Sequence, residues 1–207
     1  MTGKQDSTGL FTYGRIELEH LRKRDRKLAR VIDEIGPIER KTIPDPFAAL
    51  IHSIVGQQIS SRAAAAIWSR LREQLGEISP ETIGAASIEE LRRSGLSTRK
   101  ADYISGLGTA VVRGELDLAG LHALSDDDVI RQLTALPGIG LWTAEMYLIF
   151  SLQRPDVVSW GDLAIRRGMM NLYGLKTLSR DQFDRYRRRY SPYGSVASLY
   201  LWAVSHP

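Results

Sequence analysis

Residues 136–151 read LPGIGLWTAEMYLIFS, and the first five of them place a proline and two glycines between stretches of helical sequence. A plain turn needs only one glycine. A glycine-bearing turn ahead of a helix lets main-chain amides approach an anion closely, because no Cβ stands in the way. The helix start adds N–H groups without internal partners and a partial positive charge. The stretch therefore favours a phosphate site, with a tight αα-corner as the alternative.

The composition is that of an ordinary globular protein with a mild preference for polyanions. Of 207 residues, 43% are hydrophobic and 25% charged, and the net charge is +4. The absence of cysteine excludes disulfides, thiolate zinc sites and iron–sulfur clusters. No apolar run is long enough to span a bilayer, and the polar N-terminus lacks the apolar stretch of a signal peptide. We therefore expect a cytoplasmic protein without membrane contact.

The positive charge is concentrated in two segments, RKRDRKLAR (22–30) and RDQFDRYRRRY (180–190). Each is consistent with a solvated helix face. In the second, arginines alternate with Phe183, Tyr186 and Tyr190, a mixture that suits phosphate contacts better than plain solvation does.

Helical spacing with Ser or Asp caps and Gly stops runs along nearly the whole chain, so the predicted fold class is all-α. Asp45-Pro46 and Ser79-Pro80 each place a cap residue ahead of a first-turn proline, and capping boxes or near variants begin at Ser87 and Ser125. One helix is expected near 17–34. Others are expected at 60–76, 141–151, 162–173, 179–189 and 194–205.

The stretch LPGIGLWTA resembles the hairpin of the helix–hairpin–helix DNA-binding motif, which grips one DNA strand through backbone amides. The resemblance implies phosphate binding at Gly138, Ile139, Gly140 and Thr143. It also implies that a monovalent cation, Na⁺ or K⁺, is held by the carbonyls of Thr134, Leu136 and Ile139. The motif by itself implies DNA as partner and leaves the chemistry open.

Downstream, RPDVVSWGDLAIRRG (154–168) places Asp162 where a loop enters a helix, a position that also suits a plain N-cap. The hairpin, a tryptophan two residues past its second glycine and an aspartate twenty residues beyond that tryptophan form a more specific combination. It resembles the helix–hairpin–helix base-excision glycosylases, most closely the bacterial 3-methyladenine DNA glycosylase II family. IHSIVGQQISSRAA (51–64), GLSTRKADYI (95–104) and SPYGSVASLYLW (191–202) extend the likeness over residues 46–202.

This resemblance implies a two-lobed helical fold with the active site in the cleft between the lobes. Residues 52–155 would form the lobe that carries the hairpin, and 1–51 together with 156–207 the other. Residues 1–45 are too few for the sheet domain of the larger family members, so the chain resembles the compact, all-helical branch. It departs from those members at Met146, where they have an aromatic residue one turn after Trp142.

The family mechanism assigns a role to each matching residue. The enzyme extrudes the damaged base from the duplex, and Gln58 would fill the gap. The carboxylate of Asp162 would stabilise the positive charge that develops on the sugar. Trp142, Trp160 and Trp202, with Met146, would line the base pocket, where aromatic rings hold a cationic base by cation–π attraction. A polar helix end at Gln58, and core tryptophans, are the alternatives. No cofactor is required for this chemistry.

Position 142 also bears on the reaction type. Bifunctional relatives carry a lysine there, which forms a Schiff base with the sugar, whereas this chain has Trp142. Lys100 and Lys176 lie elsewhere and are expected at the surface. The resemblance and Trp142 together predict a monofunctional, monomeric hydrolase that releases alkylated purines of the 3-methyladenine type from double-stranded DNA in base excision repair.

Three alternatives differ in substrate or chemistry. One is a cluster-free glycosylase for mismatched adenine, thymine or uracil, and another is a non-catalytic helix–hairpin–helix DNA-binding module. A metal-dependent nuclease would need clustered carboxylates. The only such run, Asp126-Asp127-Asp128, fits the first turn of a helix better.

Overall fold

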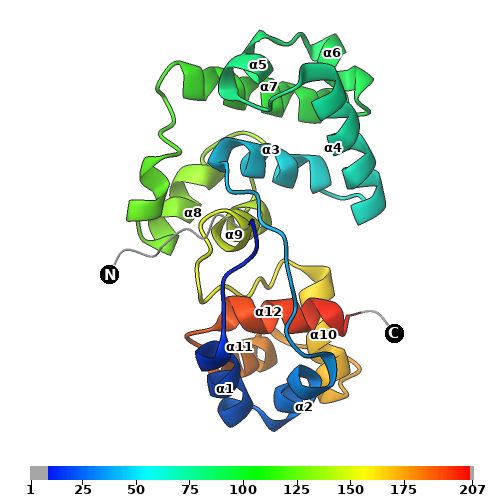
Figure 1. The fold of residues 1–207 in the computed structure, drawn as a ribbon, viewed down its shortest axis with the longest axis vertical. Coiled ribbons are helices and arrows are strands. Elements are labelled where there is room, and N and C mark those ends of the chain that lie inside the picture. Colours follow the sequence, from blue (N-terminus) through cyan, green and yellow to red (C-terminus); the bar gives the residue numbers. More distant parts are fainter. Residues whose placement is uncertain (1–8, 206–207) are drawn as a thin grey trace. The chain divides into compact units, whose positions relative to one another are not determined.

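The computed structural model describes residues 9–205, and within this range the chain is helical, as predicted (Figure 1). The elements are α1 (Arg15–Arg24), α2 (Arg26–Ile35), α3 (Pro46–Gly56), α4 (Ser61–Leu75), α5 (Pro80–Ala85), α6 (Ile88–Arg93), α7 (Thr98–Val112), η1 (Gly120–Ala123), α8 (Asp126–Thr134), α9 (Leu141–Phe150), α10 (Leu163–Tyr173), α11 (Arg180–Tyr190) and α12 (Gly194–Ala203). The only extended pairing in these residues is an isolated antiparallel bridge between Leu10 and Lys41.

The contacts divide the chain into two compact units. One contains the residues up to Thr42 together with those from Leu148 onward, and the other is Ile43–Tyr147. Both boundaries lie earlier in the chain than the boundaries expected at 51/52 and 155/156. The boundary expected at 51/52 falls inside α3, whereas the observed one at Thr42 precedes that helix.

Side-chain caps fix most helix starts in the way that the sequence predicts. Asp45 caps α3 by accepting from the amide of Ala48, and Ser60 caps α4 by accepting from Ala63. Ser87 and Glu90 form the expected capping box at α6. These contacts reach only three residues along the chain, so they follow from local sequence alone.

The unit Ile43–Tyr147 is built around α3 and α7. Helix α3 packs against α4 and α7, and α5 packs along α7 (Figure 1). Leu50, Ile51 and Ile54 of α3 are fully buried in this core. Helix α3 leads into the loop that contains Gln58, and Gly138 of the hairpin lies against Tyr103 of α7.

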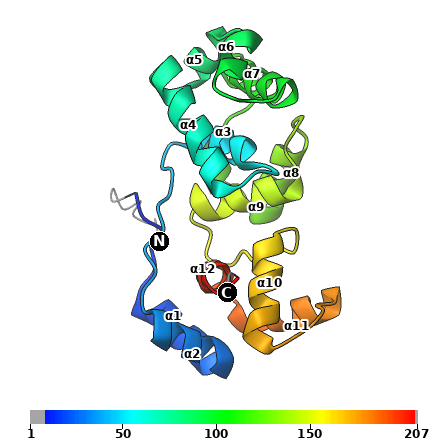
Figure 2. The ribbon, with the colours of Figure 1, turned by 90° about the vertical axis from the view of Figure 1, so that its right-hand side faces the viewer.

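In the other unit, α10 packs against α12 (Figure 2). Helix α2 packs against both. The helix expected at 17–34 is wrong as a single element, because it is interrupted at Asp25. This residue ends α1 and caps α2, accepting from the amides of Lys27 and Leu28 at 3.0 Å each.

Asp25 is also the centre of a buried polar network. Its carboxylate is 3% exposed and accepts from the Tyr173 hydroxyl at 2.5 Å and from Arg189 at 3.0 Å. The Tyr173 hydroxyl also shares a hydrogen bond with that of Tyr190. Burial alone would raise the pKa of Asp25, but the hydrogen bonds from Tyr173, the Leu28 amide and Arg189 outweigh it and hold the pKa below its usual value.

Asp25→Asn is expected to destabilise the protein by about 1–2 kcal/mol, because the cap survives but the charge-assisted bonds to Tyr173 and Arg189 weaken. The folded-state pKa is depressed, so the stability contributed by the carboxylate is complete above the unfolded value of about 3.9 and is lost as pH falls through the folded value. Thermal unfolding from pH 7 to pH 3 should show the gap between wild type and variant closing at the acid end. A gap that is constant over this range would contradict the assignment.

The same network explains the aromatic residues of the second basic segment. Phe183 and Tyr190 of α11 are buried, and Tyr186 stacks on Tyr173 with ring centroids 3.7 Å apart. They are therefore packing residues, spaced along α11 so that they face the rest of their unit, while Arg185 and Arg188 are exposed. The mixture that suggested phosphate contacts is in large part an amphipathic helix.

Candidate active site

The LPGIG hairpin joins α8 to α9 in the unit Ile43–Tyr147. The turn is closed by the amide of Ile139, which donates to the carbonyl of Leu136 at 3.2 Å. Helix α9 begins at once, with the Ala144 amide donating to the Gly140 carbonyl at 3.1 Å. Gly138 has a φ of +82°, a backbone conformation that residues other than glycine rarely adopt.

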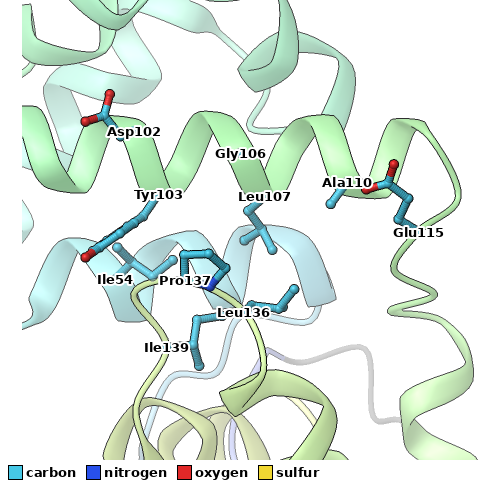
Figure 3. Close-up of a pocket in the computed structure, with 10 residues that line it drawn as sticks. All are labelled: Ile54, Asp102, Tyr103, Gly106, Leu107, Ala110, Glu115, Leu136, Pro137 and Ile139. Atoms are coloured by element: carbon cyan, nitrogen blue, oxygen red, sulfur yellow. The ribbon is translucent and has the colours of Figure 1, made fainter.

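The hairpin rests on α7. A Cβ added to Gly138 would overlap the ring of Tyr103, so this glycine is required by close approach as well as by its backbone conformation. Figure 3 shows Tyr103 and Leu107 pointing from α7 toward Pro137 and Leu136. These four residues are among those that line a cavity of about 450 Å³. The apolar side of the turn thus faces the core of its unit.

The hydrogen bonds of the turn show which of the residues predicted to bind phosphate already use their amides within the protein. The Ile139 amide already closes the turn, and the Ile139 side chain is buried. Gly138 and Gly140 remain as the positions whose amides suit an anion, together with the first turn of α9, where helical amides have no partner within the helix. Thr143 is buried in that turn, and its hydroxyl accepts from Gln57 at 2.9 Å.

Gln58 lies in the short loop between α3 and α4. Its side chain is exposed, and its φ of +56° makes it one of two non-glycine residues with a positive φ among those that the structure describes. Ile59, next to it, is an exposed apolar residue. The loop therefore presents Gln58 away from its own unit, in a conformation that must be held by its neighbours.

The neighbours that hold this loop were not identified from the sequence. Gln57 donates through Nε2 to the Gly138 carbonyl and to the Thr143 hydroxyl, at 2.9 Å each. Lys100 donates through Nζ to the carbonyls of Val55 and Gln57, at 2.8 and 2.7 Å. The expectation that Lys100 is a surface residue is wrong, because it is half-buried, and burial lowers the pKa of its ammonium group. Lys176 is exposed, as expected.

Asp162 lies in the other unit, at the start of α10. Its Oδ1 accepts from the Ile165 amide at 2.9 Å, so it is the N-cap of that helix. The residue is nevertheless only 8% exposed, unlike the exposed cap residue Asp45. The plain-cap interpretation and the functional one are therefore compatible, since a helix N-terminus also favours a negative charge.

Trp160, two residues earlier, has several partners in its own unit. Its ring meets Phe183 edge-on at 5.1 Å, and the guanidinium groups of Arg166 and Arg180 lie 4.9 and 5.6 Å from its centroid. These contacts give Trp160 a packing role. Its place in the base pocket stays a prediction, and it is the least favoured of the three predicted tryptophans because Phe183 and two guanidinium groups of its own unit contact its ring.

Trp202, near the end of α12, stacks on Phe150 with ring centroids 5.5 Å apart. The guanidinium of Arg40 lies 5.0 Å from the Phe150 centroid and 5.9 Å from that of Trp202. In the hairpin's unit, Trp142 is half-buried on α9, and Met146 is buried one turn later. Each unit therefore carries a tryptophan that is partly accessible.

Residues 9–205 contain no group of three or more His, Cys, Asp or Glu side chains placed to hold a metal ion. Asp126, Asp127 and Asp128 form the acidic first turn of α8, as the sequence predicts. None of the helices in this range combines the length and the apolar character that crossing a bilayer requires.

Comparison with known proteins decides the family. Residues 51–192 match the HhH-GPD superfamily of base excision DNA repair proteins, a span that contains the hairpin, the Gln58 loop and Asp162. The chain belongs to this superfamily.

Several relatives match this chain over almost its whole length. DNA-3-methyladenine glycosylase 1 of Schizosaccharomyces pombe is 31% identical, over 98% of this chain and 91% of the relative. The crystal structure of a DNA-3-methyladenine glycosidase from Bacillus halodurans superposes with a TM-score of 0.80 at 38% identity, covering 95% of this chain and 92% of the other. A structure of S. pombe 3-methyladenine DNA glycosylase in complex with abasic DNA superposes with a TM-score of 0.79 at 30% identity, covering 91% of this chain and 95% of the other.

Three residues next to the predicted site were not identified from the sequence: Gln57, Lys100 and Arg40. A signal for Gln57 was present, since two adjacent glutamines follow a helix-ending glycine and only one of them is needed for an exposed polar turn. Lys100 and Arg40 act through contacts with residues distant in sequence, and no local pattern marks them.

Proposed function

We propose that this chain is a monofunctional DNA glycosylase that hydrolyses the N-glycosidic bond of alkylated purines of the 3-methyladenine type in double-stranded DNA. The observation that carries the proposal is the nearly buried carboxylate of Asp162 at a helix start, in a chain of the base excision superfamily. The near full-length similarity to proteins named 3-methyladenine glycosylases supports this substrate class.

In the proposed reaction, the bond between the sugar C1′ and the base nitrogen breaks, and both electrons leave with the base. An alkylated purine such as 3-methyladenine is already cationic, so it departs as a neutral molecule and needs little acid assistance. The carboxylate of Asp162 stabilises the positive charge left on the sugar. Water then adds to C1′ and loses a proton, which completes the hydrolysis.

The base pocket is assigned to Trp142, Met146, Trp160 and Trp202. An aromatic face attracts a cationic base by about 0.5–2 kcal/mol per ring. Trp142 and Trp202 are both partly accessible, which supports this role for them. Met146 gives the pocket a flexible, polarisable wall in place of a further aromatic ring.

DNA is held by the hairpin and opened by the Gln58 loop. The amides of Gly138 and Gly140, with the first turn of α9 up to Thr143, bind a phosphate, and Gln58 fills the space of the extruded base. The carbonyls of Thr134, Leu136 and Ile139 would hold a Na⁺ or K⁺ ion. That of Thr134 ends α8, and that of Leu136 keeps a second lone pair beside the Ile139 amide. The chemistry itself requires no cofactor.

We further propose that the protein acts as a monomer, since one chain supplies every residue of the proposed site. Its place would be the cytoplasm, and in a bacterium the nucleoid, where its DNA substrate lies.

The proposal is tested by incubating the protein with methylated duplex DNA and resolving the released bases by chromatography. Free methylated purines are expected. A panel of duplexes with uracil or with mismatched adenine or thymine should give no release. Release from that panel instead would favour the mismatch alternative, and tight binding of methylated DNA without any release would favour a non-catalytic module.

No covalent adduct is expected when the protein is treated with borohydride in the presence of lesion DNA. Trp142 has no amine to form a Schiff base, and the Lys100 ammonium is engaged by two carbonyls. Denaturing electrophoresis of labelled DNA after borohydride should show only free strands. A shifted band that depends on both lesion and borohydride would overturn the monofunctional assignment.

A further inference from the structure

The Gln58 loop is tied to two other elements of its unit. It leaves α3 after Gly56, and Gln58 itself has a left-handed backbone conformation and an exposed side chain. Such a conformation is rare outside glycine and persists where surrounding contacts impose it. The contacts that impose it come from Gln57 and Lys100.

Lys100 holds the main chain of the loop. It lies in the first turn of α7, and its Nζ bridges the carbonyls of Val55 and Gln57 at 2.8 and 2.7 Å. These carbonyls are at the end of α3, where helical carbonyls lack internal partners and a positive charge is favoured. One ammonium group therefore fixes the residue directly before Gln58 to α7.

Gln57 holds the loop to the hairpin. Its Nε2 donates to the Gly138 carbonyl and to the Thr143 hydroxyl, at 2.9 Å each. Gly138 rests in turn on Tyr103 of α7. The loop, the hairpin and the start of α7 thus form one hydrogen-bonded assembly within a single unit.

We propose that Lys100 and Gln57 are positioning residues that hold Gln58 at a fixed spacing from the phosphate-binding hairpin. The inference rests on the proposed function, in which Gln58 enters the duplex while the hairpin grips the backbone. Extruding a base is unfavourable by a few kcal/mol, and a loop that is ordered in advance does not add its own ordering to that cost.

The experiment compares Lys100→Met and Gln57→Met, which keep side-chain length but remove the donors, with Lys100→Arg and with Lys176→Met, an exposed lysine of the other unit. Single-turnover base release is measured on a duplex with one paired 7-methylguanine, and on the same lesion in a single-base bulge, where extrusion is easier. A 2-aminopurine next to the lesion reports unstacking by fluorescence. Thermal unfolding identifies any variant that does not fold.

Lys100→Met and Gln57→Met should each slow release from the paired duplex about tenfold and from the bulge less than about threefold, with a weaker 2-aminopurine signal. Lys100→Arg and Lys176→Met should stay within about twofold of wild type. Because Lys100 acts through Gln58, adding Lys100→Met to Gln58→Ala should cause no further loss. Equal losses on both substrates, or additive losses in the double variant, would overturn the proposal.

The failure of the proposed function gives a different result. If wild type releases no base from either substrate, the glycosylase assignment is wrong. The 2-aminopurine fluorescence alone then tests whether Lys100 and Gln57 position Gln58. A wild-type unstacking signal that Lys100→Met and Gln57→Met reduce would support that role. Equal signals in all variants, or no signal in wild type, would refute it.

Discussion

Asp162→Asn is expected to lower the single-turnover rate of base release by about two to three orders of magnitude, the usual effect of removing one preorganised electrostatic group. The neutral amide cannot stabilise the charge on the sugar. Affinity for lesion DNA should stay within about threefold, or improve, because the hairpin and the Gln58 loop belong to the other unit. The measurement pairs base release with binding to a duplex that carries an abasic-site analogue.

The structure makes Asp162→Asn easier to interpret than Asp162→Ala. Asp162 accepts from the Ile165 amide as the cap of α10, and asparagine is an equally good cap residue. The loss of a charge near the helix N-terminus costs about 0.3–1 kcal/mol. The protein should therefore remain folded, whereas Asp162→Ala would remove the cap as well.

A matched control is available at Asp45, which caps α3 by the same geometry, accepting from the Ala48 amide, but is exposed. Asp45→Asn should leave base release within about twofold of wild type. If Asp162→Asn releases bases as fast as this control does, Asp162 is only a cap, and the catalytic assignment fails.

The features of this chain that local sequence determines could be predicted from it. Caps such as Ser60 and Ser87 bind amides three residues away, and the hairpin is specified by Pro137, Gly138 and Gly140 themselves. Asp162 could likewise be placed at a helix start. Its low exposure could only be guessed, because it depends on how α10 packs.

The features that depend on distant partners could not be predicted. Asp25 breaks the expected helix, yet its partners Tyr173 and Arg189 are 148 and 164 positions away. Lys100 likewise reaches carbonyls 43 and 45 positions earlier, and Gln57 a carbonyl 81 positions later. A lysine or glutamine at a helix end is common in solvent, so nothing in the local pattern separates these two from surface residues.

Gly138→Ala is expected to destabilise the protein by about 2–5 kcal/mol and to abolish DNA binding through the hairpin. A φ of +82° costs a non-glycine residue about 1–2 kcal/mol, and overlap with the Tyr103 ring adds about 1–3 kcal/mol as overpacking. The Gly138 carbonyl also binds Gln57, so a displaced turn would release the Gln58 loop as well. Thermal unfolding and binding to undamaged duplex at low salt measure the two effects.

Gly140→Ala distinguishes an effect on phosphate binding from an effect on the stability of the fold. Gly140 has no positive φ, and no atom beyond its chain neighbours lies within 4 Å of an added Cβ. The free energy of unfolding of this variant should therefore be within about 0.5 kcal/mol of the wild-type value. Its methyl group would nevertheless stand where the hairpin amides approach a phosphate, and affinity for duplex DNA should fall about tenfold. If Gly140→Ala binds DNA as wild type does while Gly138→Ala only unfolds earlier, both glycines serve a tight αα-corner. The phosphate grip must then lie elsewhere in the chain.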